Sequence, residues 1–458
     1  MIPMSLEDVA VAVAGTLVAA DPLAEITDVA VDSRAAGPGS LFVAVVGETH
    51  DGHEYAEAAL TQGAVATLAS SPVAGPHILV EDTVQAAGRL ARAVIAGCPD
   101  LTVVALTGSS GKTSTKDILQ VMLSAFGPTV APQGSFNNEL GLPRTVFEVT
   151  SQTRYLVAEM GARGKGHVAY LCGIAPPDVS LLLNVGHAHL SEFGTQQGVA
   201  EAKAEILSAL PPQGVGVLNA DDPFVMSQAS KAPGRVVTFG QARDADVRIT
   251  ALDLDAGRPV LTVQHGSDEV VLRPELHGEH QAFNVAAALA TAVALDLDFG
   301  QAAAALQGVR LDSRWRMEVT QTPAGVTVIN DAYNANPESM TAGLRALASM
   351  GQGQRTWAVL GEMRELGDAS LTEHDAIGRL CVRLNIGRLV AVGEGARPIH
   401  MGAAHEGSWG EESVFVQDVD AAITLLTEQV RPGDVVLVKA SRAVGLERVA
   451  AALEEMPA

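Results

Sequence analysis

Short apolar runs alternate with alanine-rich stretches over most of the chain after residue 100. Runs rich in valine and leucine occupy 101–107, 155–160, 179–185 and 215–219, and a second set occupies 326–331, 356–362, 388–393 and 434–440. Short β-rich runs that alternate with helical stretches are typical of parallel α/β domains. The pattern therefore predicts an α/β protein with two blocks of mostly parallel sheet after residue 100.

A segment of different periodicity separates the two blocks. Polar and apolar residues alternate over 244–275, which predicts an antiparallel excursion, and the alanine-rich stretch 283–295 predicts a helix after it. A chain of 458 residues is too long for a single hydrophobic core. We expect three domains: a small N-terminal α/β domain over 1–97, a central domain over 98–311 and a C-terminal domain over 312–458.

Composition and charge narrow the classes of function. Apolar residues make up 47% of the chain and charged residues 18%, which is typical of a folded globular protein. The formal net charge of −23 opposes a phosphate backbone, so we expect no nucleic-acid partner. The same charge opposes small anionic substrates. A nucleotide site in this chain would therefore have to gather the scarce basic residues around itself.

The cysteines and the N-terminus bear on the cellular compartment. Cys98, Cys172 and Cys381 lie far apart and have none of the spacings of a zinc site or a disulfide framework, so we expect reduced and buried thiols. Glu7 and Asp8 stand where a signal peptide would carry positive charge, and no apolar run is long enough to span a membrane. We expect a cytoplasmic protein without membrane insertion.

A glycine-rich segment, TGSSGKTS over 107–114, follows a predicted strand and opens a predicted helix. In that context, backbone N–H groups and the positive end of the helix can bind phosphate. Gly108 and Gly111 would allow close approach, Lys112 would contact the β- and γ-phosphates, and Thr113 would hold Mg²⁺. Leu106 stands where the usual P-loop has its first glycine, and the alternative interpretation is an ordinary turn before a helix. The remaining loop residues of the predicted ATP site are Ser109, Ser110 and Ser114.

The compact form of this loop resembles the phosphate loop of the Mur ligase family. Further segments resemble motifs of that family, in the family's order, over nearly the whole chain: 135–145, 158–167, 184–194, 202–206, 277–284, 314–318, 330–340, 361–367 and 439–442. The resemblance implies three domains, namely a UDP-binding N-terminal domain, a central P-loop ATPase-like domain and a C-terminal Rossmann-like domain. It also implies an ATP-dependent amide ligase that phosphorylates a carboxylate before an amine attacks.

The resemblance places the metal chemistry on three residues. Glu159, at the end of a predicted strand, corresponds to a Mg²⁺ ligand, and oxygen ligands suit this hard cation. His189 corresponds to the family's metal-binding histidine, whereas His187 occupies a variable position and is expected to be structural. Lys203 corresponds to a lysine that reacts with CO₂ to give a carbamate, whose oxygens would help to bind a pair of Mg²⁺ ions. Taken alone, Glu159 could be a solvated strand end and Lys203 an exposed helix lysine.

Other residues are assigned to ATP and to the acceptor substrate by the same resemblance. Asn137 and Asn138 are expected near substrate and metal, although paired asparagines are also common in turns. Asn284 is expected to contact adenine, with a helix cap as the alternative. Arg316 is expected to reach the γ-phosphate, and Asp331 to hold the ribose. ATP would then be bound between domains, and domain closure would complete the site.

The C-terminal motifs resemble those of the family branch that adds D-alanyl-D-alanine to a UDP-N-acetylmuramoyl-tripeptide. Tyr333, Asn334 and Asn336 are expected to contact the incoming dipeptide or ATP. Lys439 and Arg442 are expected to pair with the free carboxylate of the dipeptide. A tight polar turn and a strand-end salt bridge are the corresponding structural alternatives.

The N-terminal segment resembles the UDP-binding domain of the family's peptide ligases, with Ser33 and Arg34 as expected substrate contacts. The expected partners are the UDP-linked tripeptide and the dipeptide, and the expected oligomeric state is a monomer. Two rival hypotheses remain. One is another ligase of the superfamily, such as the diaminopimelate- or lysine-adding enzyme or a folylpolyglutamate synthase. The other is a P-loop switch protein without ligase chemistry.

Overall fold

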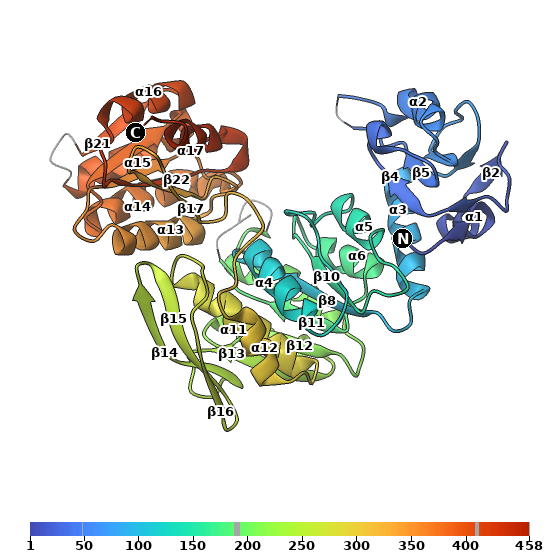
Figure 1. Cartoon of the computed structure of the whole chain (residues 1–458), viewed down its shortest axis with the longest axis horizontal. Coiled ribbons are helices and arrows are strands. Elements are labelled where there is room, and N and C mark those ends of the chain that lie inside the picture. Colours follow the sequence, from blue (N-terminus) through green and yellow to red (C-terminus); the bar gives the residue numbers. More distant parts are fainter. Residues whose placement is uncertain (48, 187–192, 408–411, 458) are drawn as a thin grey trace.

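The computed structural model describes residues 1–47, 49–186, 193–407 and 412–457. In these residues the strands form a five-stranded, a nine-stranded and a six-stranded sheet, and a small two-stranded sheet. Figure 1 shows three lobes in chain order, with the N-terminal lobe in blue, the central lobe in cyan to yellow and the C-terminal lobe in orange to red. The predicted α/β fold class with three domains is confirmed.

The N-terminal lobe is built on the five-stranded sheet, in the order β2-β7-β6-β5-β4. Neighbouring strands are parallel from β4 to β7, and β2 pairs antiparallel with β7. Its strands are β1 (Met4–Ser5), β2 (Thr16–Val18), β3 (Glu25–Ile26), β4 (Asp28–Ala30), β5 (Ser40–Val43), β6 (Ala66–Ala69) and β7 (His77–Leu79). Its helices are α1 (Leu6–Val13), η1 (Ser33–Ala35), η2 (Gly52–Tyr55), α2 (Ala56–Thr61) and α3 (Thr83–Ala96).

Helix α3 joins the N-terminal lobe to the central lobe. Asp82 caps it by accepting hydrogen bonds from the N–H groups of Val84 and Gln85, a common way to begin a helix. Its apolar side chains belong to the same buried cluster as residues of the central strands and helices, including Leu142 and Leu171. The hydrophobic core is therefore continuous between the two lobes.

The central lobe carries the nine-stranded sheet, in the order β16-β15-β14-β13-β12-β11-β8-β10-β9. Neighbours are parallel from β9 to β14, and the last three strands are antiparallel. The strands are β8 (Thr102–Thr107), β9 (Thr129–Val130), β10 (Tyr155–Glu159), β11 (Val179–Leu182), β12 (Val215–Asn219), β13 (Arg235–Gly240), β14 (Val247–Asp255), β15 (Arg258–His265) and β16 (Asp268–Leu272). The predicted antiparallel excursion thus extends the parallel sheet at one edge.

Helices cover both faces of this sheet. One buried cluster contains α4 (Lys112–Ser124), α11 (His280–Ala294) and α12 (Phe299–Leu306). The helices α5 (Gly141–Val146), α6 (His167–Ile174), α8 (Gln196–Lys203), α9 (Glu205–Ser208) and α10 (Pro223–Met226) contribute to the cluster that includes α3. A short η3 (Ala229–Lys231) follows α10. The parallel strands are consequently buried on both faces, which explains their continuous apolar runs.

The C-terminal lobe has a six-stranded sheet in the order β17-β18-β22-β19-β20-β21, parallel except for the β17–β18 pair. Its strands are β17 (Glu318–Gln321), β18 (Thr327–Asn330), β19 (Thr356–Leu360), β20 (Arg388–Val392), β21 (Ser413–Val416) and β22 (Val435–Lys439). Helices α13 (Pro337–Met350), α14 (Ser370–Arg383) and α15 (Arg397–Glu406) pack on one face, and α16 (Val419–Gln429) and α17 (Glu447–Glu454) on the other. Single turns η4 (Gly367–Ala369), η5 (Glu394–Ala396) and η6 (Arg442–Val444) complete the lobe.

The three cysteines are buried and free, as predicted. Burial raises the pKa of the Cys172 and Cys381 thiols to about 12, so both stay protonated near neutral pH.

Within the described parts of the chain, no helix combines the length and the apolar character needed to cross a membrane.

Candidate active site between the central and C-terminal lobes

The phosphate loop connects β8 to α4, at the carboxyl end of a central parallel strand. Gly111 precedes α4 with a φ of 77°, and a Cβ atom there would lie 2.7 Å from Asn284 Oδ1. Both the backbone angle and the close approach require glycine. Asn284 lies inside α11, so the alternative that it caps this helix is wrong. It instead packs against the loop, accepting a hydrogen bond from Thr115 Oγ1 at 3.2 Å.

Asn184, which follows β11, holds the loop from the neighbouring strand. Its Oδ1 accepts from the Ser110 N–H at 2.9 Å, and its Nδ2 donates to the Ser110 carbonyl at 3.1 Å. Ser109 accepts a hydrogen bond at Oγ from the Gly186 N–H at 2.8 Å. These contacts fix the loop conformation before any phosphate binds, which reduces the entropy cost of binding.

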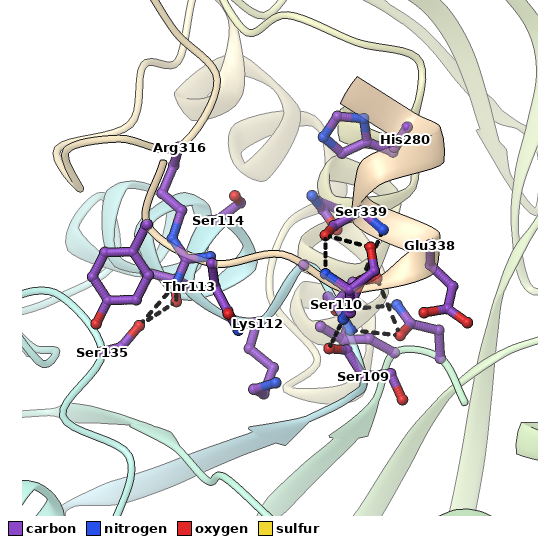
Figure 2. Close-up of a pocket in the computed structure, with 18 of the residues that line it drawn as sticks. Ser109, Ser110, Lys112, Thr113, Ser114, Ser135, His280, Arg316, Glu338 and Ser339 are labelled. Carbon is purple, nitrogen blue, oxygen red and sulfur yellow. Dashed lines mark hydrogen bonds between the residues drawn. The ribbon is translucent and has the colours of Figure 1, made fainter. Parts of the chain in front are cut away.

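The loop opens onto a cavity of about 750 Å³ that both lobes line. Figure 2 shows part of this cavity, with loop residues facing Arg316 and residues of the C-terminal lobe. Of the predicted site residues, the lining includes Ser109, Ser110, Gly111, Lys112, Thr113, Ser114, Asn137, Glu159, Asn284, Arg316, Asp331, Tyr333, Asn334, Asn336, Lys439 and Arg442. Basic side chains thus gather at this cavity although the chain has a net charge of −23, as expected for a site that binds an anionic nucleotide.

Two ammonium groups converge beneath the loop. Lys112 Nζ donates to the Gly108 carbonyl at 2.7 Å, and Lys203 Nζ donates to the same oxygen at 3.1 Å. Lys203 is the last residue of α8 and is 1% exposed, which rules out an exposed helix lysine. Burial, with the nearby Lys112 charge, holds the pKa of Lys203 well below its usual value. Burial also lowers the pKa of Lys112, and the Glu159 carboxylate opposes that shift.

Glu159 ends β10 and is 1% exposed, so it is not a solvated strand end. Its Oε1 accepts from Asn137 Nδ2 at 2.8 Å. Its Oε2 is buried and has no hydrogen-bond partner among the described residues. A buried carboxylate oxygen without a donor is costly unless a cation is bound nearby.

Arg316 reaches the loop from the segment that links the two lobes. Its Nη2 donates to Thr113 Oγ1 at 2.9 Å and to Ser135 Oγ at 3.1 Å, as Figure 2 shows. The guanidinium lies over the ring of Tyr333, 4.0 Å from its centroid. A cationic side chain from outside the central sheet is therefore held at the predicted metal-binding hydroxyl of the phosphate loop.

The C-terminal motifs meet the cavity at the ends of β18 and β22. Lys439 is buried, and its Nζ donates to Asp331 Oδ2 at 2.5 Å and to the Asn334 carbonyl at 2.9 Å. Arg442 is half exposed and lies over the ring of Trp315 at 4.2 Å. Both side chains already pair with a carboxylate, Lys439 with Asp331 and Arg442 with Glu447. The half-exposed guanidinium of Arg442 has further N–H donors to offer, so Arg442 is the better placed of the two predicted anchors.

Asn336 connects the C-terminal lobe directly to the phosphate loop. It begins α13 with a reciprocal capping arrangement with Ser339, followed by a proline in the first turn. Its Nδ2 also donates to the Ser109 carbonyl at 3.2 Å. One side chain thus serves both as a helix cap and as an interlobe contact.

Several predicted residues do not line the cavity. Asn138 accepts hydrogen bonds from the N–H groups of Leu140 and Gly141, which is turn chemistry. Ser33 and Arg34 belong to the N-terminal lobe, where Arg34 is exposed and paired with Asp32 at 2.6 Å. This ion pair and a backbone hydrogen bond lower the pKa of Asp32 to about 2. The predictions for His187 and His189 fall outside the described residues.

The cavity also includes residues that the sequence did not single out. Ser135, Asn184, His280, Gln281, Glu338 and Glu365 all line it. All lie within segments that resemble Mur ligase motifs, and this location in the sequence could have identified them as candidate site residues. Burial lowers the pKa of His280 to about 4, so this imidazole is neutral near pH 7.

Comparison with known proteins agrees with this architecture. Three protein-family models match the chain. The Mur ligase family catalytic domain matches residues 25–102, the Mur ligase middle domain matches 106–292, and the Mur ligase glutamate ligase domain matches 315–442. A UDP-N-acetylmuramoyl-tripeptide–D-alanyl-D-alanine ligase of Mycobacterium tuberculosis is 45% identical, with 92% of this chain and 91% of the relative covered.

Solved structures give the same relationship. The crystal structure of MurF from Acinetobacter baumannii has a TM-score of 0.90 at 31% identity, with 99% of each chain covered. A MurF ligase from Thermotoga maritima in complex with ADP has a TM-score of 0.81 at 30% identity, with 93% of this chain and 97% of that chain covered. From its domain matches and its similarity to these relatives over nearly the full length, the chain belongs to the Mur ligase family.

Proposed function

We propose that this chain is an ATP-dependent ligase that joins D-alanyl-D-alanine to a UDP-N-acetylmuramoyl-tripeptide in the synthesis of peptidoglycan precursors. The observation that carries the proposal is a cavity in which the phosphate loop, Arg316 and the C-terminal motif residues meet. The names of the M. tuberculosis and A. baumannii relatives, and their similarity over nearly the whole of this chain, support the choice of this branch. The T. maritima relative, which is solved with ADP, supports ATP as the nucleotide.

The proposed domain roles follow the lobes. Residues 1–97 would bind the UDP part of the acceptor, with Ser33 and Arg34 among the contacts. Residues 98–311 would bind ATP, and residues 312–458 would bind the incoming dipeptide and complete the nucleotide site. The continuous core between the first two lobes supports a stable arrangement of acceptor and ATP sites.

The proposed reaction has two steps. A carboxylate oxygen of the tripeptide attacks the γ-phosphorus of ATP, the bond to the β-phosphate oxygen breaks, and ADP leaves. The amine of the dipeptide then attacks the acyl carbon, phosphate leaves, and the amine proton is lost to form the amide. Charge accumulates on the phosphoryl oxygens in the first step, so fixed cations stabilise it. Lys112 and Arg316 are proposed to supply that charge.

The residues present fit a Mg²⁺ ion, whose role is to neutralise the phosphate oxygens and orient the transferred group. Glu159 Oε2 is buried without a donor among the described residues, and the Thr113 hydroxyl borders the same cavity. The described residues contain no cluster of three His, Cys, Asp or Glu side chains that would hold a metal alone. Mg²⁺ ordinarily keeps several waters and takes few protein ligands, which is compatible with this set. His189 is the further proposed ligand.

Lys203 is proposed to act as a carbamate. A free amine, rather than an ammonium, reacts with CO₂, and the strongly lowered pKa of this buried lysine favours the free amine. Carbamate formation replaces a positive charge by a negative one beside Lys112. A second positive charge is unfavourable where both lysine nitrogens meet one carbonyl oxygen, whereas a carbamate at Lys203 would attract the Lys112 ammonium.

The remaining proposed contacts divide between nucleotide and substrates. Asn284 would contact adenine and Asp331 the ribose, with Asn137 and Asn138 near the acceptor. Tyr333, Asn334 and Asn336 would contact the dipeptide or ATP, and Arg442 would pair with the dipeptide carboxylate. A monomer is proposed as the oligomeric state.

A substrate-omission assay tests the proposal. We expect ADP, phosphate and amide product in equal amounts only when ATP, Mg²⁺, UDP-N-acetylmuramoyl-tripeptide and D-alanyl-D-alanine are all present. ATP hydrolysis that needs neither acceptor nor amine would support a switch protein instead. In a competition of amines read by product mass, addition of free diaminopimelate or lysine to a dipeptide precursor would assign the chain to a sibling branch.

A further inference from the structure

The segment that links the central and C-terminal lobes is hydrogen-bonded to the phosphate-loop helix at two points. The first is Ser313, whose N–H and Oγ donate to the two carboxylate oxygens of Asp117, each at 3.1 Å. The second is Arg316, whose Nη2 donates to Thr113 Oγ1 at 2.9 Å. Figure 1 shows this connection rising from α12 past α4 toward β17.

The two contacts lie close together both along helix α4 and along the link. Thr113 and Asp117 are four residues apart in α4, so their side chains lie on one face of the helix, one turn apart. Ser313 and Arg316 are three residues apart in the link. The contact at Asp117 therefore determines how much of the link remains free to move before Arg316.

Asp117 is held in an unusual buried ion pair. Its side chain is 3% exposed and that of Lys116 is 2% exposed, and the two are paired. Lys116 Nζ also donates to Ser313 Oγ at 3.4 Å. Sequence neighbours on a helix ordinarily point in different directions. Here both side chains turn toward the same serine, and this desolvated pair stays satisfied only with its partners in place.

The backbone between the Ser313 contact and β17 is strained. Trp315 and Met317 have φ angles of 59° and 53°, a region that bulky L-residues rarely adopt. Such conformations persist only where surrounding contacts impose them. The Trp315 N–H donates to Glu318 Oε2 and the Met317 N–H donates to Asp331 Oδ1, each at 3.1 Å. These hydrogen bonds on the C-terminal side, and the Ser313 contact on the other, supply those constraints. The intervening Arg316 is thereby presented to the phosphate loop in one orientation.

We propose that Asp117, together with Lys116, is a positioning group that docks the interlobe link at Ser313 and so sets where Arg316 meets the phosphate loop. Neither residue borders the cavity as the described chain forms it, so they act through Arg316 and not on substrate. The inference rests on the proposed role of Arg316 at the γ-phosphate. When the C-terminal lobe rotates, the hinge lies within 314–317, on the C-terminal side of the Ser313 contact.

The first test is kinetic. Ser313→Ala should lower kcat about tenfold to a hundredfold, since small misplacements of a catalytic contact have effects of this size. The dissociation constant for ADP should stay within about twofold, because the phosphate loop itself is unchanged. Ser313→Thr, which keeps the hydroxyl, should recover most of kcat. Ser124→Ala is the matched control, since Ser124 lies on the same helix and donates to Gln120 within it.

A double-mutant cycle separates positioning from general destabilisation. If Ser313 acts through Arg316, Ser313→Ala should change kcat less than about twofold in an Arg316→Ala background. An equal loss in both backgrounds would overturn the inference, because it would show that the two residues act independently.

The second test needs no ligase activity. Hydrogen exchange of the amides of 313–317 should be at least about tenfold faster in Asp117→Asn and in Ser313→Ala than in the parent protein. Ser313→Ala removes the Oγ donor to Asp117 and keeps the backbone N–H donor. Unchanged exchange in Ser313→Ala would therefore overturn the role of the Ser313 hydroxyl in docking the link, even if Asp117→Asn fails to fold. If the parent protein makes no amide from the named substrates, the proposed function is wrong, while exchange still decides whether Ser313 is docked.

Discussion

Lys112 and Lys203, which are 91 positions apart in the sequence, donate to the same carbonyl oxygen, that of Gly108. Two ammonium groups on one acceptor repel each other, and burial lowers the pKa of both lysines. An anion between them would relieve this repulsion. The proposed phosphate of ATP and the proposed carbamate of Lys203 would each supply a negative charge at this point of the loop, despite the acidic character of the whole chain.

Lys112→Ala should leave the chain folded and lower turnover by about 10²–10³-fold, the effect of losing one preorganised electrostatic contact. The measurement is steady-state formation of ADP and amide product, with circular dichroism as the check on folding. A folded variant with near-normal turnover would remove Lys112 from the mechanism.

Lys203→Ala should lose at least about 10²-fold in activity, because a carbamate and its charge would be missing. Short carboxylic acids such as formate or acetate should restore part of the activity by occupying the vacated space. Lys231→Ala is the control, since that ammonium donates to the Glu201 carbonyl at the surface. Full activity of Lys203→Ala in CO₂-depleted buffer would contradict the carbamate.

Arg442→Ala and Lys439→Met should have different effects. Arg442→Ala should raise the KM for D-alanyl-D-alanine about tenfold or more with little change in ATP binding, since a charge-assisted pair to the carboxylate is lost. Lys439→Met should instead reduce stability by about 3–5 kcal/mol, because it leaves the Asp331 carboxylate without its buried partner. Dipeptide kinetics and chemical denaturation distinguish the two. An unchanged dipeptide KM in Arg442→Ala would eliminate that anchor.

Stability should fall as the pH drops from about 6.5 to about 4. Burial lowers the pKa of His280 from 6.5 to about 4 in the folded chain, so the unfolded chain binds a proton first on acidification. The contribution is complete above pH 6.5, is lost progressively as pH falls toward 4, and amounts to ~3 kcal/mol. Calorimetric unfolding at several pH values should show a weaker pH dependence in His280→Gln. An equal dependence in the variant would assign the effect to other groups.

Much of the fold was predictable from local patterns. The runs at 101–107 and 215–219 correspond to β8 and β12, and each run in the second set contains a strand of the C-terminal sheet. Their signal is strong because strands buried on both faces are apolar throughout. By contrast, β9 has two residues, too few for any periodicity. The strand β13 was not predicted, although its four consecutive apolar or β-branched residues between Arg235 and Gly240 are a local signal as strong as that of β12.

The sequence by itself determined which segments carry the chemistry. The phosphate loop can be recognised because its glycines, lysine and threonine lie in one short segment. Lys112 and Thr113 of this loop line the cavity. Arg316 and Asp331 come from separate motifs, and they line the same cavity as the loop. For Arg316 and Asp331 the resemblance to the Mur ligase motifs carried the predictions, whereas the phosphate loop was also readable from its own residues.

Only the tertiary structure decided which partners these residues have. Lys439 and Arg442 are equivalent cations in the sequence, yet Lys439 is buried against Asp331 and Arg442 is half exposed. Asp117 and Ser313 are 196 positions apart, and no local pattern links them. Burial and pairing depend on which distant segments the folded chain brings together. The charge that a side chain offers to a substrate is therefore a property of the fold, while its chemical type is a property of the sequence.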